Sequence, residues 1–203
     1  MTAVENRFPG DAPKARKVGP RRVAGVGVTV VMAMAAAVWL YIGSRPELGP
    51  GSWGGAAGGV SQVGDRYELD GSSTGTVHAS IRNTGNAPVT LVGVADDAPA
   101  LQPGNEFSPL SHLRWGVIPE AEGPGGLALS TEPIRLTPGE EAYVELGVHA
   151  PRCVSHSAGT RVSIGALPLQ VRSLGLTSVT DAPLSPPVTI RFTADQPAAG
   201  DCR

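Results

Sequence analysis

The chain has 203 residues, with 16 Lys and Arg against 18 Asp and Glu, two Cys, 27 Gly and 19 Pro. A hydrophobic share of 41% excludes a wholly disordered chain, while the high Gly and Pro content indicates many loops around a folded core. Trp, Tyr and Phe number three each, so that core has to be built mainly from Val, Leu, Ile and Ala.

The charges are distributed unevenly along the chain. Residues 1–22 carry six basic and two acidic side chains, a net charge of +4, and are predicted to form a basic cytoplasmic tail. Residues 46–203 carry nine Arg and sixteen acids, a net charge of −7. Phosphate backbones bind clustered positive charge, so this balance argues against a nucleic-acid partner.

Residues 23–44 contain no charged side chain over 22 positions. A helix of that length crosses a hydrocarbon core of about 30 Å, so the sequence predicts one transmembrane helix in the lipid bilayer. Arg21 and Arg22 precede it, and Trp39 and Tyr41 lie at its far end, as membrane-interface residues do. The positive-inside tendency predicts a single-pass cell-membrane protein with a cytoplasmic N-terminus and an extracytoplasmic C-terminal domain.

A cleaved signal peptide is the alternative to this anchor. Small residues that suit a cleavage site lie within the apolar run, at Ala33, Ala35, Ala36 and Ala37. Cleavage there would leave the apolar residues 38–42 as the new N-terminus, and the run exceeds the usual core of about 7–15 residues. We therefore favour an uncleaved signal-anchor.

Residues 45–62 are rich in Gly and Pro and show no periodicity. Such a composition is typical of flexible linkers, so this segment is predicted to tether an extracytoplasmic domain, residues 63–203.

From residue 63 the hydrophobic pattern has a period of two, which indicates strands with one buried face. In residues 76–82 the inward set is Val77, Ala79 and Ile81. The same alternation puts Ala142, Val144, Leu146 and Val148 inward in residues 141–149, and Val188, Ile190 and Phe192 inward near the C-terminus. Further candidate strands are residues 65–70, 87–95, 113–118, 127–136 and 160–172. Seven or eight short strands without a convincing helix indicate a β-sandwich.

Two segments, TVHASIRNTGNAPVTL (76–91) and IRLTPGEEAYVELGVHAP (134–151), resemble bacterial immunoglobulin-like modules related to cell adhesion or appended to surface enzymes. Asn83 and Gly85 suit positive φ at the first turn, and Pro138-Gly139 suits a type II turn. The pattern departs from antibody-type domains, which pair Cys across the two sheets with a Trp packed on the disulfide. The resemblance implies an all-β, immunoglobulin-like β-sandwich after the transmembrane helix, with a binding or spacer role.

Cys153 and Cys202 are the only cysteines, and both follow the predicted anchor. In an oxidising compartment an even count favours a disulfide between them. A free thiol or an intermolecular bridge is the alternative.

No catalytic residue, metal ligand or cofactor is predicted. His149, Cys153 and His156 could bind zinc or copper, but a disulfide would occupy the thiolate and no Met follows residue 34. Asp96-Asp97 and Glu140-Glu141 lack the spacing of a calcium loop and are interpreted as solvated acids. Motifs of nucleophilic catalysis such as Gly-x-Ser-x-Gly do not occur.

The sequence therefore favours a non-enzymatic binding or spacer module of the bacterial cell envelope, with an envelope protein or wall polymer as partner. The alternative is a surface hydrolase or carbohydrate-binding accessory that uses loop carboxylates at 96–97 and 120–122. Trp115 and Tyr143 are either contact residues or core.

Overall fold

A computed structural model describes residues 20–43, 45–119 and 124–198, with side chains described from Val28 onward. The chain divides into two units at the Val38–Trp39 boundary, and each is described by itself.

The segment predicted to cross the membrane is a helix, α1 (Pro20–Gly43). Trp39 and Tyr41 are 55% and 61% exposed, while the side chains of Arg21 and Arg22 lie outside the described set. Among the residues that the structure describes, no helix is both long and apolar enough to cross a membrane. The transmembrane anchor stays a prediction.

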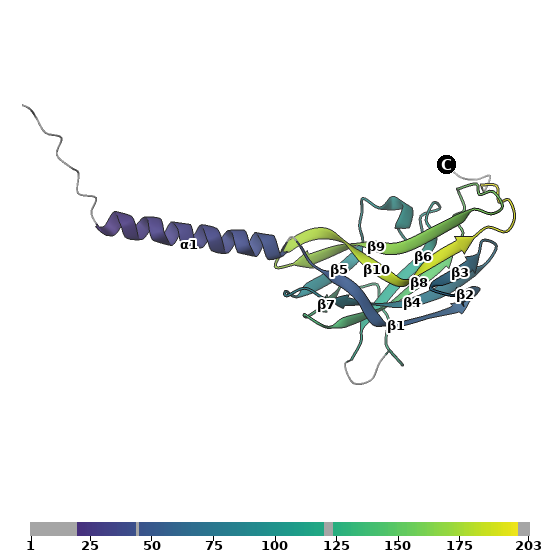
Figure 1. The fold of residues 1–203 in the computed structure, drawn as a ribbon, viewed down its shortest axis with the longest axis horizontal. Helices are drawn as coiled ribbons and strands as arrows, with labels where there is room; N and C mark the ends of the chain where they lie inside the picture. The colour runs from purple at the N-terminus through teal and green to yellow at the C-terminus, as the bar shows by residue number, and fades with distance from the viewer. Residues whose placement is uncertain (1–19, 44, 120–123, 199–203) are drawn as a thin grey trace, which may run out of the picture. The chain divides into compact units, whose positions relative to one another are not determined.

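The second unit is all-β, as predicted, and its strands form two sheets (Figure 1). The four-stranded sheet has the order β1-β4-β8-β6, with bounds Leu48–Gly58, Thr74–Asn83, Glu141–His149 and Leu110–Val117. The six-stranded sheet has the order β2-β3-β10-β9-β5-β7, with bounds Val60–Val63, Arg66–Asp70, Leu176–Arg191, Arg161–Ser173, Val89–Val94 and Ile134–Leu136. Neighbouring strands are antiparallel except β3 and β10, and one 3₁₀ turn, η1 (Pro99–Leu101), follows β5.

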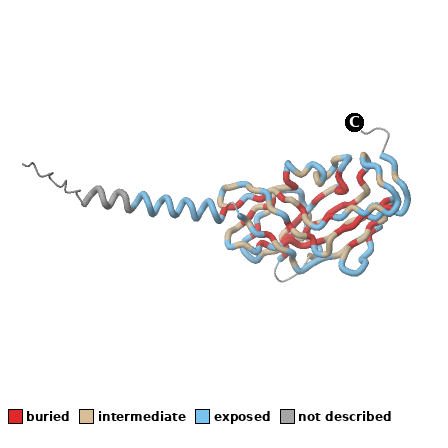
Figure 2. The backbone as a smooth tube through the Cα atoms, turned by 45° about the horizontal axis from the view of Figure 1, so that its top comes forward, coloured by how far each residue is buried: buried red, intermediate tan, exposed pale blue. Residues whose placement is uncertain are grey.

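One hydrophobic core takes residues from both sheets. In Figure 2 the buried residues are the red stretches of the backbone in the β-rich part of the chain. The predicted inward residues are buried there: Val77, Ala79 and Ile81 on β4 are 0–3% exposed, and the inward set of β8 is 0–1% exposed. Burial of these alternating side chains stabilises the fold, since each fully buried Val, Leu or Ile contributes about 1.5–3 kcal/mol. The period of two thus correctly identified the buried faces.

Most predicted strands match the observed ones to within three residues at either end, and two differ by more. The expected strand over 127–136 shortens to β7, residues 134–136, and the last strand starts at Leu176 rather than near Val188. The longer β10 pairs with β9 along most of its length, so it forms a long antiparallel ribbon with β9.

The predicted linker was wrong for residues 48–62. β1 pairs with β4, and β2 pairs with β3, so this segment belongs to both sheets. Leu48 and Val60 are each 9% exposed and attach it to the core. The chain passes from one sheet to the other at Gly58, whose φ of +71° suits glycine. Backbone hydrogen bonds to β4 hold β1 in the sheet. Its Gly-rich sequence can therefore form a strand without an alternation of hydrophobic side chains.

The two predicted turns have different outcomes. Gly139 has φ of +88°, and the N–H of Glu140 donates to the carbonyl of Thr137, as expected for Pro-Gly in a tight turn. Asn83 and Gly85 do not have positive φ, so the expectation for that turn was wrong. Asn83 is instead fully buried, and its amide bonds to the backbone around it.

Candidate functional site

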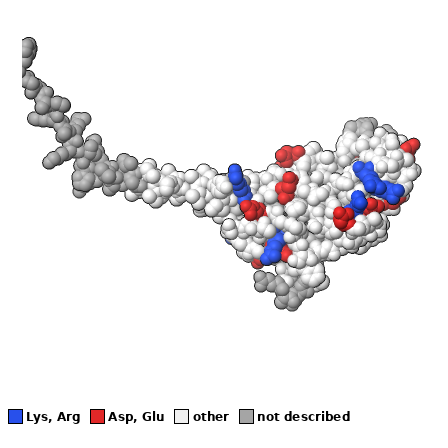
Figure 3. Space-filling model, viewed as in Figure 1, with Lys and Arg blue, Asp and Glu red and all other residues white. Residues whose placement is uncertain are grey.

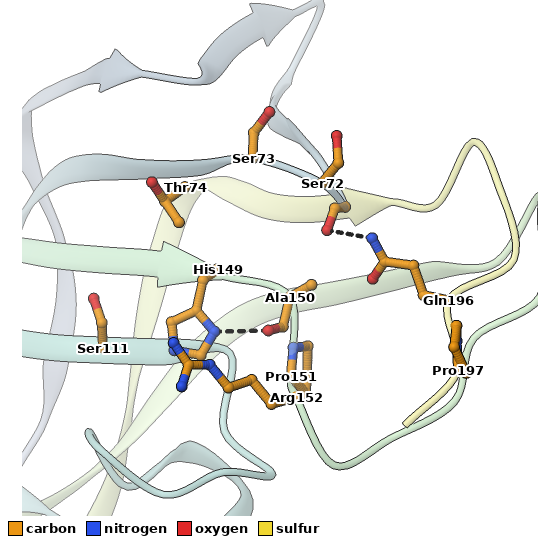
Figure 4. Close-up of a pocket in the computed structure, with 11 residues that line it drawn as sticks. Ser72, Ser73, Thr74, Ser111, His149, Ala150, Pro151, Arg152, Gln196 and Pro197 are labelled. Atoms are coloured by element: carbon orange, nitrogen blue, oxygen red, sulfur yellow. Dashed lines mark hydrogen bonds between the residues drawn. The ribbon is translucent and has the colours of Figure 1, made fainter. Parts of the chain in front are cut away.

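A polar cleft of about 750 Å³ opens where several strands end (Figure 4). Its lining comes from the β3–β4 turn, the start of β4, β6, the end of β8 with the loop that follows, and the C-terminal segment. The residues are Gly71, Ser72, Ser73, Thr74, Ser111, His149, Ala150, Pro151, Arg152, Gln196 and Pro197. Polar side chains from separate parts of the chain therefore meet at one end of the all-β unit.

His149 is the half-buried titratable residue of this cleft. Its Nδ1 lies 2.7 Å from the carbonyl oxygen of Ala150, which can only accept, so Nδ1 carries a proton. In the neutral ring Nε2 is then an acceptor. In Figure 4 the exposed Arg152 extends toward this ring. The N–H of Arg152 donates to the carbonyl of Glu106 at 3.0 Å, which holds the loop after β8 in place.

Asp70 fixes the β3–β4 turn, which supplies Ser72 to the lining of the cleft. Its Oδ1 accepts the N–H of Ser72 at 2.9 Å and the hydroxyl of Ser72 at 2.6 Å, while Oδ2 accepts Thr193 Oγ1. These hydrogen bonds, the Ser72 side chain first, lower the pKa of Asp70 and outweigh the small desolvation that would raise it. The turn is therefore held by an ionised carboxylate at neutral pH.

The C-terminal segment closes the other side of the cleft. Gln196 Nε2 donates to the carbonyl of Gly71 at 2.8 Å. Two backbone hydrogen bonds, of 2.8 and 2.7 Å, join Gln196 to His156. The cleft wall thus combines segments more than a hundred residues apart in sequence.

The outer face of the four-stranded sheet carries a second polar group, centred on Glu145 of β8. Glu145 forms an ion pair with Arg114 of β6, and its oxygens lie 3.3 Å from His112 Nε2 and 4.0 Å from His78 Nδ1. Tyr143 stacks on His78 with ring centroids 5.4 Å apart. Figure 3 shows small groups of mixed charge on the face in view. This cluster links β4, β8 and β6 across the sheet.

The residues considered as metal ligands are not arranged as a site. His149 lies in the cleft, while His156 stacks on Phe192 with ring centroids 3.9 Å apart. In the described part of the chain, no three His, Cys, Asp or Glu residues are grouped to hold a metal ion.

The predicted disulfide stays a prediction, because Cys202 lies outside the described residues. Cys153 lies in the loop after β8, with Sγ 3.2 Å from Glu106 Oε2, and its N–H donates to the carbonyl of Glu106.

The acidic residues that the sequence analysis considered lie in different environments. Asp96 and Asp97 are exposed after β5, and residues 120–122 lie outside the described ranges. Glu140 accepts the N–H of Thr137 at 2.6 Å, and Glu141 accepts both the N–H and the hydroxyl of Ser52. These hydrogen bonds are exposed, and both acids hold neighbouring groups in place, a role that the interpretation as solvated acids did not include.

The two aromatic candidates, Trp115 and Tyr143, differ in burial. Trp115 is 2% exposed and donates through Nε1 to the carbonyl of Glu132 at 2.7 Å, so it is a core residue. Tyr143 is half-buried on the outer face. Sequence reasoning missed Trp53, which it placed in the linker although this residue is ordered on β1 and 46% exposed. A lone Trp in a Gly-rich segment was the available signal.

Comparison with known proteins adds no assignment: no family model matches the chain, and no curated protein matches it.

Proposed function

We propose that the chain is a membrane-anchored, extracytoplasmic binding module of the bacterial cell envelope, with an immunoglobulin-like all-β domain. The observation that supports it best is the polar cleft at the strand ends. Binding sites built on sandwiches commonly use loop and strand-end side chains that a rigid pair of sheets positions.

The lining of the cleft suggests the chemistry of the ligand. The hydroxyls of Ser73, Thr74 and Ser111 can donate and accept, the Ser72 hydroxyl donates to Asp70 and can still accept, and Gln196 adds an amide. Arg152 adds a positive charge, and none of the lining residues that the structure describes is Asp or Glu. A polar partner with an acidic group near Arg152 fits this set best, and both an envelope protein and a wall polymer can present one.

In-cell cross-linking of the tagged full-length protein tests the proposal. We expect mass spectrometry to recover one reproducible envelope component, and we expect Arg152→Ala to reduce its yield strongly. The matched control is Arg172→Ala, which removes an exposed Arg on β9 away from the cleft lining.

Two outcomes would contradict the proposal. Equal recovery with Arg152→Ala and wild type would remove the cleft as the contact. Turnover of an envelope polymer by the purified full chain would favour the hydrolase alternative.

A further inference from the structure

Trp53 lies exposed on an irregular segment of β1. The register between β1 and β4 shifts between Pro50 and Gly54, which is a β-bulge or equivalent break. Bulges commonly redirect a side chain near a functional site. Single exposed aromatic residues are common on protein surfaces, but the backbone of Trp53 is fixed by neighbouring side chains and the residue lines a hollow.

Between Pro50 and Gly54, where the regular pairing of β1 with β4 is interrupted, backbone groups of β1 bond to side chains of β4 and β8. The N–H of Trp53 donates to Oγ of the buried Ser80 at 2.8 Å, and Ser80 Oγ lies 3.1 Å from the carbonyl of Trp53. The N–H and hydroxyl of Ser52 each donate to a different oxygen of Glu141, both at 2.9 Å. Ser52 and Trp53, two of the three residues between Pro50 and Gly54, are thereby anchored through their backbone.

Gly51 makes this arrangement possible. A Cβ at this position would lie 2.7 Å from Glu141 Oε2 and would crowd the side chain of Ser80, so a larger residue would displace the anchoring groups. Gly51, Ser80 and Glu141 thus depend on one another to hold the backbone at Trp53.

A hollow of about 450 Å³ lies beside the indole. It is lined by Ser52, Trp53, Arg82, Ile118, Pro119, Gly139 and Glu141. Arg82 is exposed, and its Nε donates to the carbonyl of Gly139 at 3.0 Å, which orients the guanidinium at the hollow. The volume falls within the range of about 300–1,000 Å³ that is usual for small-molecule sites.

We infer that this hollow binds one ring of a neutral carbohydrate chain. The electron-rich face of an indole attracts the weakly positive C–H groups on the apolar face of a pyranose. Sugar hydroxyls both donate and accept, so they match a donor, Arg82, and an acceptor, Glu141, on the same wall. Among the lining residues that the structure describes, the charged ones are Arg82 and Glu141, one positive and one negative, and this balance favours an uncharged ligand over an ionic one.

This site is separate from the polar cleft, and the inference goes beyond the proposed function. Glu141 is the first residue of β8 and His149 is the last, which places the hollow and the cleft about 27 Å apart along the strand. Loss of one site leaves the other intact.

The test measures binding of the full chain to immobilised neutral oligosaccharides, namely hexose and N-acetylhexosamine chains. The protein is kept in a detergent without a sugar headgroup, because a glycoside headgroup would compete. We expect binding to at least one of these chains and a blue shift of the tryptophan emission that is absent in Trp53→Ala. Trp53→Ala should weaken binding at least about tenfold, the factor that corresponds to about 1.4 kcal/mol, and Trp53→Tyr should restore most of it.

Phe107→Ala is the matched control, since Phe107 is an equally exposed aromatic at 48% and does not line the hollow. It should leave carbohydrate binding unchanged, as should Arg152→Ala, while Arg152→Ala alone should reduce the cross-linked partner. Circular dichroism checks that each variant folds. Failure to bind any of these chains, equal binding by Trp53→Ala, or a preference for proline-rich peptides over the sugars would overturn the inference.

Discussion

Nε of Arg114 donates to Oε1 of Glu145 at 3.0 Å, and the two residues are direct partners in the register of β6 and β8. Glu145 also pairs in register with His78 on β4. One carboxylate thus joins the outer faces of three strands, while the inner faces of the same strands fill the core. Cross-strand pairs of opposite charge stabilise sheets modestly, by about 0.2–1 kcal/mol each.

Replacing Glu145 with Gln should give a pH-dependent loss of stability. Burial alone would raise the pKa of Glu145, but the hydrogen bond and charge of Arg114, with smaller contributions from His78 and His112, lower it below the usual 4.5. A depressed folded-state pKa stabilises the fold above about pH 4.5, and this contribution disappears as the pH falls through the lowered value. At pH 7 we expect Glu145→Gln to reduce the free energy of unfolding by about 1 kcal/mol.

Urea denaturation at pH 7 and pH 3 measures the gap between the free energies of unfolding of the wild type and the variant. It should narrow at pH 3, whereas a gap of equal size at both pH values would contradict the ionised role of Glu145. Asp65→Asn is the control, because the Asp65 side chain is 96% exposed, and it should change stability little at pH 7.

Replacing Asn83 with Ala should destabilise the all-β unit strongly. Its buried amide donates to the carbonyls of Ala87 and Leu136 and accepts the N–H of Gly85, at 2.9, 3.1 and 3.1 Å. Removing the amide leaves these backbone groups without partners, which should cost about 3 kcal/mol. Thermal denaturation of the full chain measures the loss. Asn86→Ala, an exposed position in the same turn, should be close to neutral, and comparable effects of the two variants would refute the anchoring role.

Replacing Ser80 with Ala should loosen the irregular segment of β1. The variant deprives the N–H and carbonyl of Trp53 of the Ser80 hydroxyl, and we expect a stability loss of about 1–2 kcal/mol. In a Trp39→Phe background, which removes the other exposed Trp, quenching of tryptophan fluorescence by iodide should increase as the Trp53 indole becomes more mobile. The exposed Ser61→Ala on β2 is the control. Unchanged quenching in Ser80→Ala would show that other contacts hold the indole.

The predicted disulfide between Cys153 and Cys202 can be tested chemically. Alkylation of the unfolded, unreduced chain should find no free thiol, and peptide mapping should recover Cys153 linked to Cys202. On the chain-entropy model, Cys202→Ser should lower the free energy of unfolding by about 4 kcal/mol. Two alkylated cysteines, or a disulfide-linked dimer, would favour one of the alternatives.

Local pattern in the sequence was sufficient for much of the fold. The alternation in residues 76–82 and 141–149 identified strands and their buried faces, because successive side chains of a strand point to opposite sides. The Pro138-Gly139 turn was readable for a similar reason, since its conformation depends on those two residues. The outer-face partners of Glu145 were not readable, because register joins residues that are far apart in the chain.

The strand β1 and the exposure of Trp53 were decided only by tertiary structure. Residues 48–58 have no hydrophobic period, and their strand exists because the backbone of β4 pairs with them. Sequence alone likewise left Trp115 and Trp53 without distinct roles, and the fold buried the first and exposed the second. Alternation is a local property that the order of residues encodes directly. Pairing, and the burial of single side chains, depend on which distant backbone supplies the hydrogen bonds and covers the ring.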